Sequence, residues 1–131
     1  MKTFLIISAL FCANIIQAQT VNTRVVGNST YTNTLNVAKA GNGAVKLFTV
    51  LGQNASSSTA YVQVFNSTTN PANGTIPVFS VPVPASPQYY SIDFGYYGAD
   101  FDAVTICIST NANTLGLAST NFTIQAITRS N

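Results

Sequence analysis

The chain has 131 residues and a mass of 13.8 kDa, a length typical of one domain. Only 6% of the residues are charged, with a formal net charge of +2, whereas 47% are hydrophobic. The small net charge argues against phosphate-driven binding of nucleic acid, and the hydrophobic content excludes a disordered chain. The chain has no His, so it lacks the usual proton shuttle near neutral pH. Its many Thr, Val, Ile, Phe and Tyr residues favour β-strands.

Residues 1–18 have the pattern of a secretory signal peptide. Lys2 supplies a positive start, residues 4–16 are mostly apolar, and Ala18 is a small residue before a plausible cleavage site. As a helix the apolar run is about 20 Å long, shorter than the roughly 30 Å core of a bilayer, so we expect no membrane span. We therefore predict export of residues 19–131. The alternative is that the leader is retained as an amphipathic or buried helix.

The rest of the chain has the pattern of short strands separated by polar turns. We predict about eight strands, at residues 21–26, 31–37, 45–51, 61–65, 75–84, 89–94, 103–109 and 122–128. The segment 75–84 contains three prolines, which donate no ladder hydrogen bond, so it is expected at a sheet edge or a bulge. No stretch after residue 20 keeps a helical period. The predicted fold is all-β, with one β-sandwich or jelly-roll-like domain over residues 19–131.

Apolar residues at alternating strand positions predict the core. The expected inward set is Leu47 or Phe48, with Val50, Val62, Val64, Phe79, Ile92, Phe94, Val104, Ile106, Ile108 and Ile124. Residues 103–109 are apolar on both faces, which predicts the most buried strand. Cys107 lies in this strand, where we expect a buried and unreactive thiol. An intermolecular disulfide is the alternative.

Three carboxylates are the only candidates for a metal site. Asp100 and Asp102 are two residues apart and share one face if their segment is extended. With Asp93 and nearby carbonyls they would offer the oxygen ligands that Ca²⁺ prefers. The alternative is that they are turn-forming acids in a solvated loop. No base stands near a nucleophile in the sequence, so we expect no cofactor and no enzymatic activity.

Two tyrosine pairs form the one aromatic concentration: Tyr89 with Tyr90, and Tyr96 with Tyr97. Tyrosine is enriched in interfaces, where its ring packs and its hydroxyl forms hydrogen bonds. The pairs are therefore candidates to stack on sugars or to contact a partner chain. The alternative is that they pack into the core at the end of a sheet.

The second half of the chain contains an ordered series of segments. They are residues 62–66 (Val-Gln-Val-Phe-Asn), 71–77 (Pro-Ala-Asn-Gly-Thr-Ile-Pro), 81–84 (Val-Pro-Val-Pro), 91–95 (Ser-Ile-Asp-Phe-Gly) with Phe101, and 106–110 (Ile-Cys-Ile-Ser-Thr). In order and spacing this series resembles a group of small virion-associated structural proteins of tailed bacteriophages. The resemblance covers about residues 46–114. It implies a β-sandwich building block of a capsid or appendage surface, without catalysis.

The sequence thus predicts a non-enzymatic structural protein that decorates the exterior of a phage virion. Its expected partners are further copies of itself and other virion structural proteins. The export leader leaves a secreted bacterial surface adhesin or filament subunit as an alternative, with an extracellular location. The tyrosine pairs leave another alternative, a small carbohydrate-binding module that contacts surface glycans.

Overall fold

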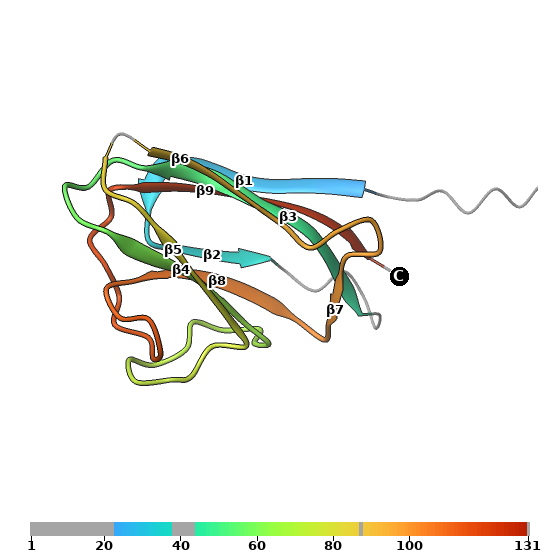
Figure 1. Cartoon of the computed structure of the whole chain (residues 1–131). Helices are drawn as coiled ribbons and strands as arrows, with labels where there is room; N and C mark the ends of the chain where they lie inside the picture. Colours follow the sequence, from blue (N-terminus) through green and yellow to red (C-terminus); the bar gives the residue numbers. More distant parts are fainter. Residues whose placement is uncertain (1–22, 38–43, 87, 131) are drawn as a thin grey trace, which may run out of the picture.

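The computed structural model describes residues 23–37, 44–86 and 88–130 (Figure 1). The predicted leader, residues 1–18, lies outside the described residues. Within the described ranges all regular structure is β-strand, which confirms the all-β prediction. The same ranges contain no helix long and apolar enough to cross a membrane.

The strands form two antiparallel sheets that pack face to face (Figure 1). Their bounds are β1 Thr23–Thr32, β2 Thr34–Val37, β3 Val45–Asn54, β4 Ala60–Phe65, β5 Phe79–Val83, β6 Gln88–Asp93, β7 Ala99–Phe101, β8 Val104–Ser109 and β9 Phe122–Ser130. Sheet A has the order β1-β9-β3-β6, and β7 also pairs with β3. Sheet B has the order β2-β8-β4-β5. The predicted β-sandwich is therefore confirmed.

The order of the strands is that of a jelly roll. When β7 is set aside, the first, last, third and sixth strands form sheet A, and the remaining strands form sheet B. The chain therefore crosses between the sheets repeatedly, and several crossing loops meet at one end of the sandwich (Figure 1, left). Backbone hydrogen bonds join these loops, from Ala55 N to Asn121 O at 2.9 Å and from Ser86 N to Ser56 O at 2.7 Å.

The core lies between the sheets and consists of the alternating inward residues of both. The predicted members Val50, Val62, Val64, Ile92, Val104, Ile106, Ile108 and Ile124 are all buried. Leu47 is buried, whereas Phe48 is half-buried, which settles the choice between them. Phe94 is partly buried and packs against the core. The prediction for Phe79 is wrong: this residue begins the edge strand β5 and is 38% exposed, because no strand covers it on that side.

Several predicted strand bounds need correction. The first strand does not end before Gly27 and Asn28 but continues to Thr32, because β9 pairs with residues 23–28 and, after a register shift, with Thr32. The predicted strand 31–37 is divided at Asn33, where the chain passes from sheet A to sheet B. Strand β7 was not predicted, since three residues are too few to show a period.

The proline-containing strand takes the predicted place at a sheet edge. Strand β5 is shorter than expected, because it begins at Phe79 and excludes Pro77. It pairs only with β4, so it is the edge of sheet B. Pro82 lies opposite Tyr61 within this ladder. An edge strand tolerates the missing donor of a proline, as the sequence led us to expect.

Strand β8 is buried on both faces, as predicted. Its inward residues belong to the main core, whereas Thr105, Cys107 and Ser109 face the other side. The loops 66–78 and 110–118 bond to that outer face: Thr105 Oγ1 donates to Ser67 O at 2.9 Å, and Ser109 Oγ donates to Asn111 O at 2.9 Å. Sheet B thus carries a second, smaller core on its outer face, beneath these loops.

The thiol of Cys107 has the buried environment that we predicted. Burial raises its pKa to about 11, against a smaller lowering effect of the hydrogen bond with the Thr34 side chain. The thiolate is the reactive form, so at pH 8 we expect iodoacetamide to modify Cys107 only after unfolding. Peptide mapping by mass spectrometry separates its modification from that of Cys12. Rapid modification of Cys107 in the native protein would contradict this burial.

Candidate functional site

The three carboxylates are not gathered into one site. Asp93 Oδ1 accepts a hydrogen bond of 2.7 Å from the backbone N–H of the next turn. Asp100 forms an ion pair with Lys46 at 2.9 Å. Asp102 accepts a bond of 3.4 Å from Asn66 Nδ2. In the parts of the chain that the structure describes, no three His, Cys, Asp or Glu residues lie together as a metal-binding group. Asp93 instead binds within its own turn, whereas Asp100 and Asp102 contact residues that are distant in the chain.

Tyr90 is the one member of the tyrosine pairs that packs inward. It lies opposite Gly52 of β3, and its hydroxyl donates to Thr123 O of β9 at 2.8 Å. A Cβ on Gly52 would lie 2.7 Å from Cζ of Tyr90, so a larger residue at this position would clash with the tyrosine ring. Burial raises the pKa of the Tyr90 phenol. The alternative of core packing therefore applies to Tyr90, which is partly buried against the core.

The other three tyrosines are on the surface. Tyr89 lies on the outer face of sheet A and is 73% exposed. Tyr96 and Tyr97 lie in the turn between β6 and β7 and are 90% and 81% exposed. Their rings meet edge to face, with centroids 5.3 Å apart and an interplanar angle of 85°. Two adjacent exposed rings thus remain as a candidate contact surface.

The turn that carries these rings is fixed by its glycines. Gly95 and Gly98 have φ values of 79° and 65°, which favour glycine over other residues. Gly98 N donates to Gly95 O at 3.0 Å and closes the turn. A Cβ on Gly98 would lie 2.9 Å from the backbone oxygen of Leu47, so the turn lies close against β3. The sequence Gly-Tyr-Tyr-Gly therefore holds both tyrosines at a defined place over sheet A.

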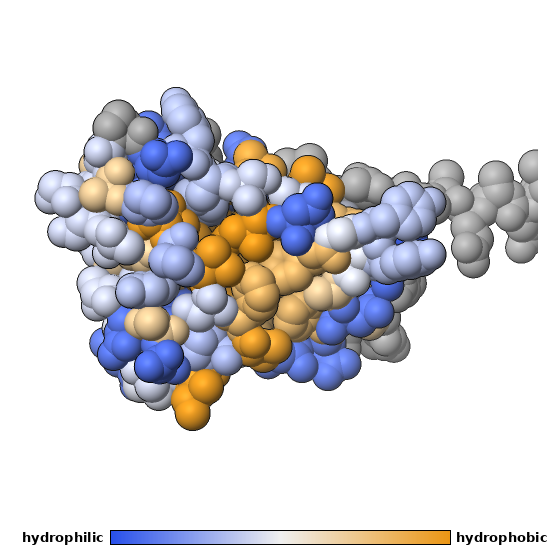
Figure 2. Space-filling model, in the orientation of Figure 1, coloured by the Kyte–Doolittle hydropathy of each residue, from blue (hydrophilic) through white to orange (hydrophobic). Residues whose placement is uncertain are grey.

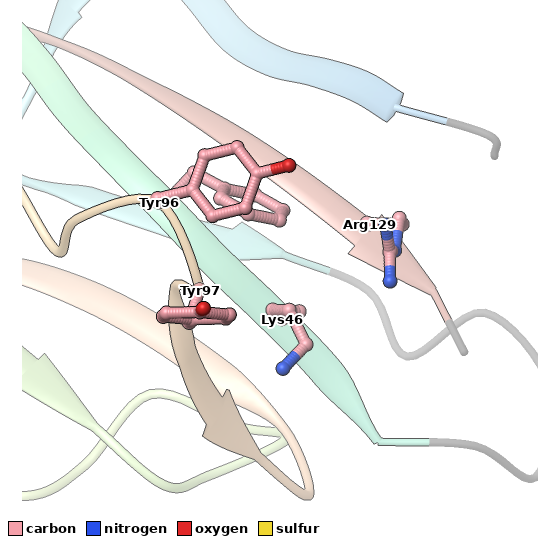
Figure 3. A pocket seen from close by; sticks show the side chains of 5 residues that line it. Lys46, Tyr96, Tyr97 and Arg129 are labelled. Carbon is pink, nitrogen blue, oxygen red and sulfur yellow. The ribbon is translucent and has the colours of Figure 1, made fainter.

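A concave surface lies beside this turn, with a volume of about 370 Å³. Its lining residues are Tyr96 and Tyr97 from the turn, Lys46 and Phe48 from β3, and Arg129 from β9. Figure 3 shows the tyrosines on the turn and the two cationic side chains on the strands beside them. We call this set the tyrosine–cation surface. Sequence reasoning found its two tyrosines but missed the residues that β3 and β9 contribute.

The charges of the surface follow from strand register. Lys46 lies opposite Arg129 on one side and opposite Asp100 on the other. The Asp100 carboxylate pairs with Lys46, whose side chain is 18% exposed. Arg129 has no ion pair among the described residues. Lys46, Arg129 and Asp100 together carry one net positive charge. Like charges directly opposite in a ladder are unfavourable, so a bound anion would stabilise this arrangement.

A second surface is apolar. Ile76 and Val78 are 76% and 64% exposed, and Phe79 follows them at the start of β5. The Phe79 ring lies 5.1 Å from that of Phe94, which follows β6. Figure 2 shows apolar residues gathered in the middle of this face, where β5 and β6 lie in front. We call Ile76, Val78, Phe79 and Phe94 the apolar edge surface, because Ile76 and Val78 precede the edge strand β5 and Phe94 follows the edge strand β6.

No family model, curated protein or solved structure matches this chain. The resemblance to small virion proteins therefore stays a prediction from the sequence.

Proposed function

We propose that the chain is a non-enzymatic structural protein on the exterior of a bacteriophage particle. The observation that carries the proposal is the jelly-roll strand order, an architecture that recurs in viral capsid and lectin domains. Because a fold alone does not determine a function, the proposed location on a phage particle rests on the sequence resemblance. Its segments lie in β4 to β8 and in the loop 66–78 that covers sheet B.

The chemistry of the described side chains supports a role without catalysis. The chain has no His to act as a base. Cys107 is buried with a raised pKa. Each of the three carboxylates already has a partner, which is a backbone N–H of a turn, a lysine or an asparagine side chain. A nucleophile needs a base within hydrogen-bond reach, and no such pair is found among the described residues.

The apolar edge surface suits contact with neighbouring copies or with other shell proteins. Exposed apolar side chains that lie together mark interaction surfaces on soluble proteins. The net charge of +2 gives little repulsion between close copies. Pro82 on the β5 edge lacks a donor, which opposes open-ended pairing of strands. We therefore infer that copies pack through side chains at this edge rather than by extending a sheet.

Mass spectrometry of gradient-purified phage particles tests the proposal. We expect the chain at a copy number comparable with that of the major shell protein. Val78→Asp places a charge in the apolar edge surface and should lower the copy number, whereas Ser91→Asp, an exposed residue on the outer face of β6, should not. If the chain is missing from particles and occurs only as a free monomer in culture fluid, the structural proposal fails.

A secreted surface protein is the second candidate, either an adhesin or filament subunit or a small carbohydrate-binding module. The observation that favours it is the exposed Tyr96 and Tyr97 pair beside a concave surface. Ligand sites are concave and combine aromatic side chains with a few polar groups. Recovery of the chain from the cell surface or the medium, and not from particles, would favour this candidate.

A further inference from the structure

We propose that the tyrosine–cation surface binds a saccharide that carries a carboxylate, such as a uronic acid residue. This inference goes beyond the particle role, because the surface would bind such a sugar wherever the chain is displayed. It rests on three features of the surface: its aromatic rings, a cation that has no ion pair among the described residues, and its fixed backbone frame.

The aromatic rings match the apolar face of a sugar. Tyr96, Tyr97 and Phe48 line the surface together. The face of an aromatic ring is electronegative and attracts the C–H groups of a pyranose, which carry a partial positive charge. The phenol oxygens lie at the rims of the tyrosine rings, where they can exchange hydrogen bonds with sugar hydroxyls. The volume of about 370 Å³ lies at the small end of the range for ligand sites, which suits one or two sugar rings.

The charge of the surface selects an acidic sugar over a neutral one. Arg129 presents a guanidinium to the concavity without an ion pair among the described residues. A guanidinium binds a carboxylate with two parallel hydrogen bonds, a geometry that also adds specificity. Lys46 on the neighbouring strand is already paired with Asp100, so the site has one net positive charge for one carboxylate.

The frame holds the backbone of these residues in place before any ligand arrives. The turn is closed by the bond from Gly98 N to Gly95 O and lies against β3. Phe94 N donates to Phe48 O at 2.8 Å, which joins the start of the turn to the floor of the surface. Lys46 and Arg129 are paired positions of one ladder. A preformed surface loses little conformational entropy on binding, which raises its affinity for a small ligand.

The backbone around the site favours a sugar over an acidic peptide. Peptides commonly bind by adding a strand to a free sheet edge. At Lys46 strand β3 is paired with β9 on one side and with β7 on the other, so it offers no free edge there. The β3 and β9 residues of the surface can therefore contact a ligand only through their side chains, and a stacked ring with one carboxylate meets that condition.

The test is a titration of the purified full chain with trigalacturonic acid, followed by the NMR shifts of backbone amides. We expect shifts at residues 95–98 and at Lys46 and Arg129, with a dissociation constant of about 0.1–1 mM at low salt. The methyl ester of the same trisaccharide keeps the rings and removes the charge. It should bind about tenfold more weakly, because a charge-assisted hydrogen bond is lost.

Three variants separate the contributions. Tyr97→Ala should weaken both the acid and the ester about tenfold, since it removes the stacking ring. Arg129→Gln should weaken the acid about tenfold and leave the ester unchanged. Asp100→Asn removes the competing carboxylate beside Lys46 and should tighten binding of the acid severalfold. Tyr89→Ala is the matched control, because it removes an equally exposed tyrosine of the same sheet face outside the surface.

Four outcomes would overturn the proposal. The first is no binding of the acid at 10 mM of the probe, on the order of ten times the weakest expected dissociation constant. The second is equal affinity for the acid and its ester, and the third is an equal loss of affinity in Tyr89→Ala and Tyr97→Ala. The fourth is that a hexapeptide of glutamate saturates the same amides as the sugar. Presence of the chain in phage particles is measured separately, so either proposal can fail while the other holds.

Discussion

Replacement of Phe122 by alanine is expected to destabilise the domain by about 3–5 kcal/mol. Phe122 is 1% exposed and is the largest fully buried side chain among those that the structure describes. It lies opposite Asn54 of β3 and begins the inward set of β9. Its removal takes away the transfer free energy of a whole ring and leaves a cavity that the paired sheets cannot fill. Urea unfolding followed by far-UV circular dichroism measures the change.

Ile127→Ala is the matched control on the same strand. Ile127 lies on the outer face of sheet A and is half-buried, so its truncation should cost about 1 kcal/mol or less. The contrast tests the register of β9, because a shift of one residue would exchange the two faces. Equal effects of the two variants would show that the inward and outward faces are assigned wrongly.

Replacement of Asn54 by alanine is expected to cost about 3–4 kcal/mol, although Asn54 is polar. Its side chain is fully buried and joins two loops at one end of the sandwich. Nδ2 donates to Ser58 O at 3.0 Å and to Pro84 O at 2.7 Å, and Oδ1 accepts from Ser56 N at 2.8 Å. The alanine variant leaves these backbone groups without their partner, which is the costly way to lose a hydrogen bond.

Asn121→Ala is the control for this end of the molecule. Asn121 is exposed, and its carbonyl, which alanine keeps, accepts the bond from Ala55 N. We expect a change within about 0.5 kcal/mol. Thermal unfolding of both variants gives the comparison. A wild-type melting temperature for Asn54→Ala would mean that the two loops are not held by this side chain.

The sandwich was predictable because apolar residues alternate along most of its strands and polar turns separate them. The inward residues of β4 and β8 follow a clear period of two, so Val62, Val64, Ile106 and Ile108 were all assigned to the core. Phe79 shows the limit of this pattern. The alternation of apolar and polar residues indicates which side of a strand a residue faces. It does not indicate whether a neighbouring strand extends far enough to cover that residue. Edge position, which decides the burial of Phe79, is a property of the assembled sheet.

The candidate site was only half predictable, for a related reason. Tyr96 and Tyr97 are adjacent in the sequence and lie between two turn glycines, so local pattern reveals them. Lys46 and Arg129 are far apart in the chain and meet because β3 and β9 pair in one register. Asp100 lies opposite Lys46 because β7 pairs with β3, and the sequence pattern does not predict β7. Sites assembled by long-range pairing become visible only when the sheet order is known.

Cryo-electron microscopy of purified phage particles tests directly whether the chain is a structural protein on the particle exterior. We expect repeated density for the two-sheet sandwich on the outer surface of the head or an appendage. In that density the apolar edge surface at Ile76, Val78 and Phe79 should contact a neighbouring subunit, and the Tyr96 and Tyr97 turn should face solvent. Particles with no such density, or with the sandwich enclosed inside the shell, would show that the chain is not an exterior structural protein.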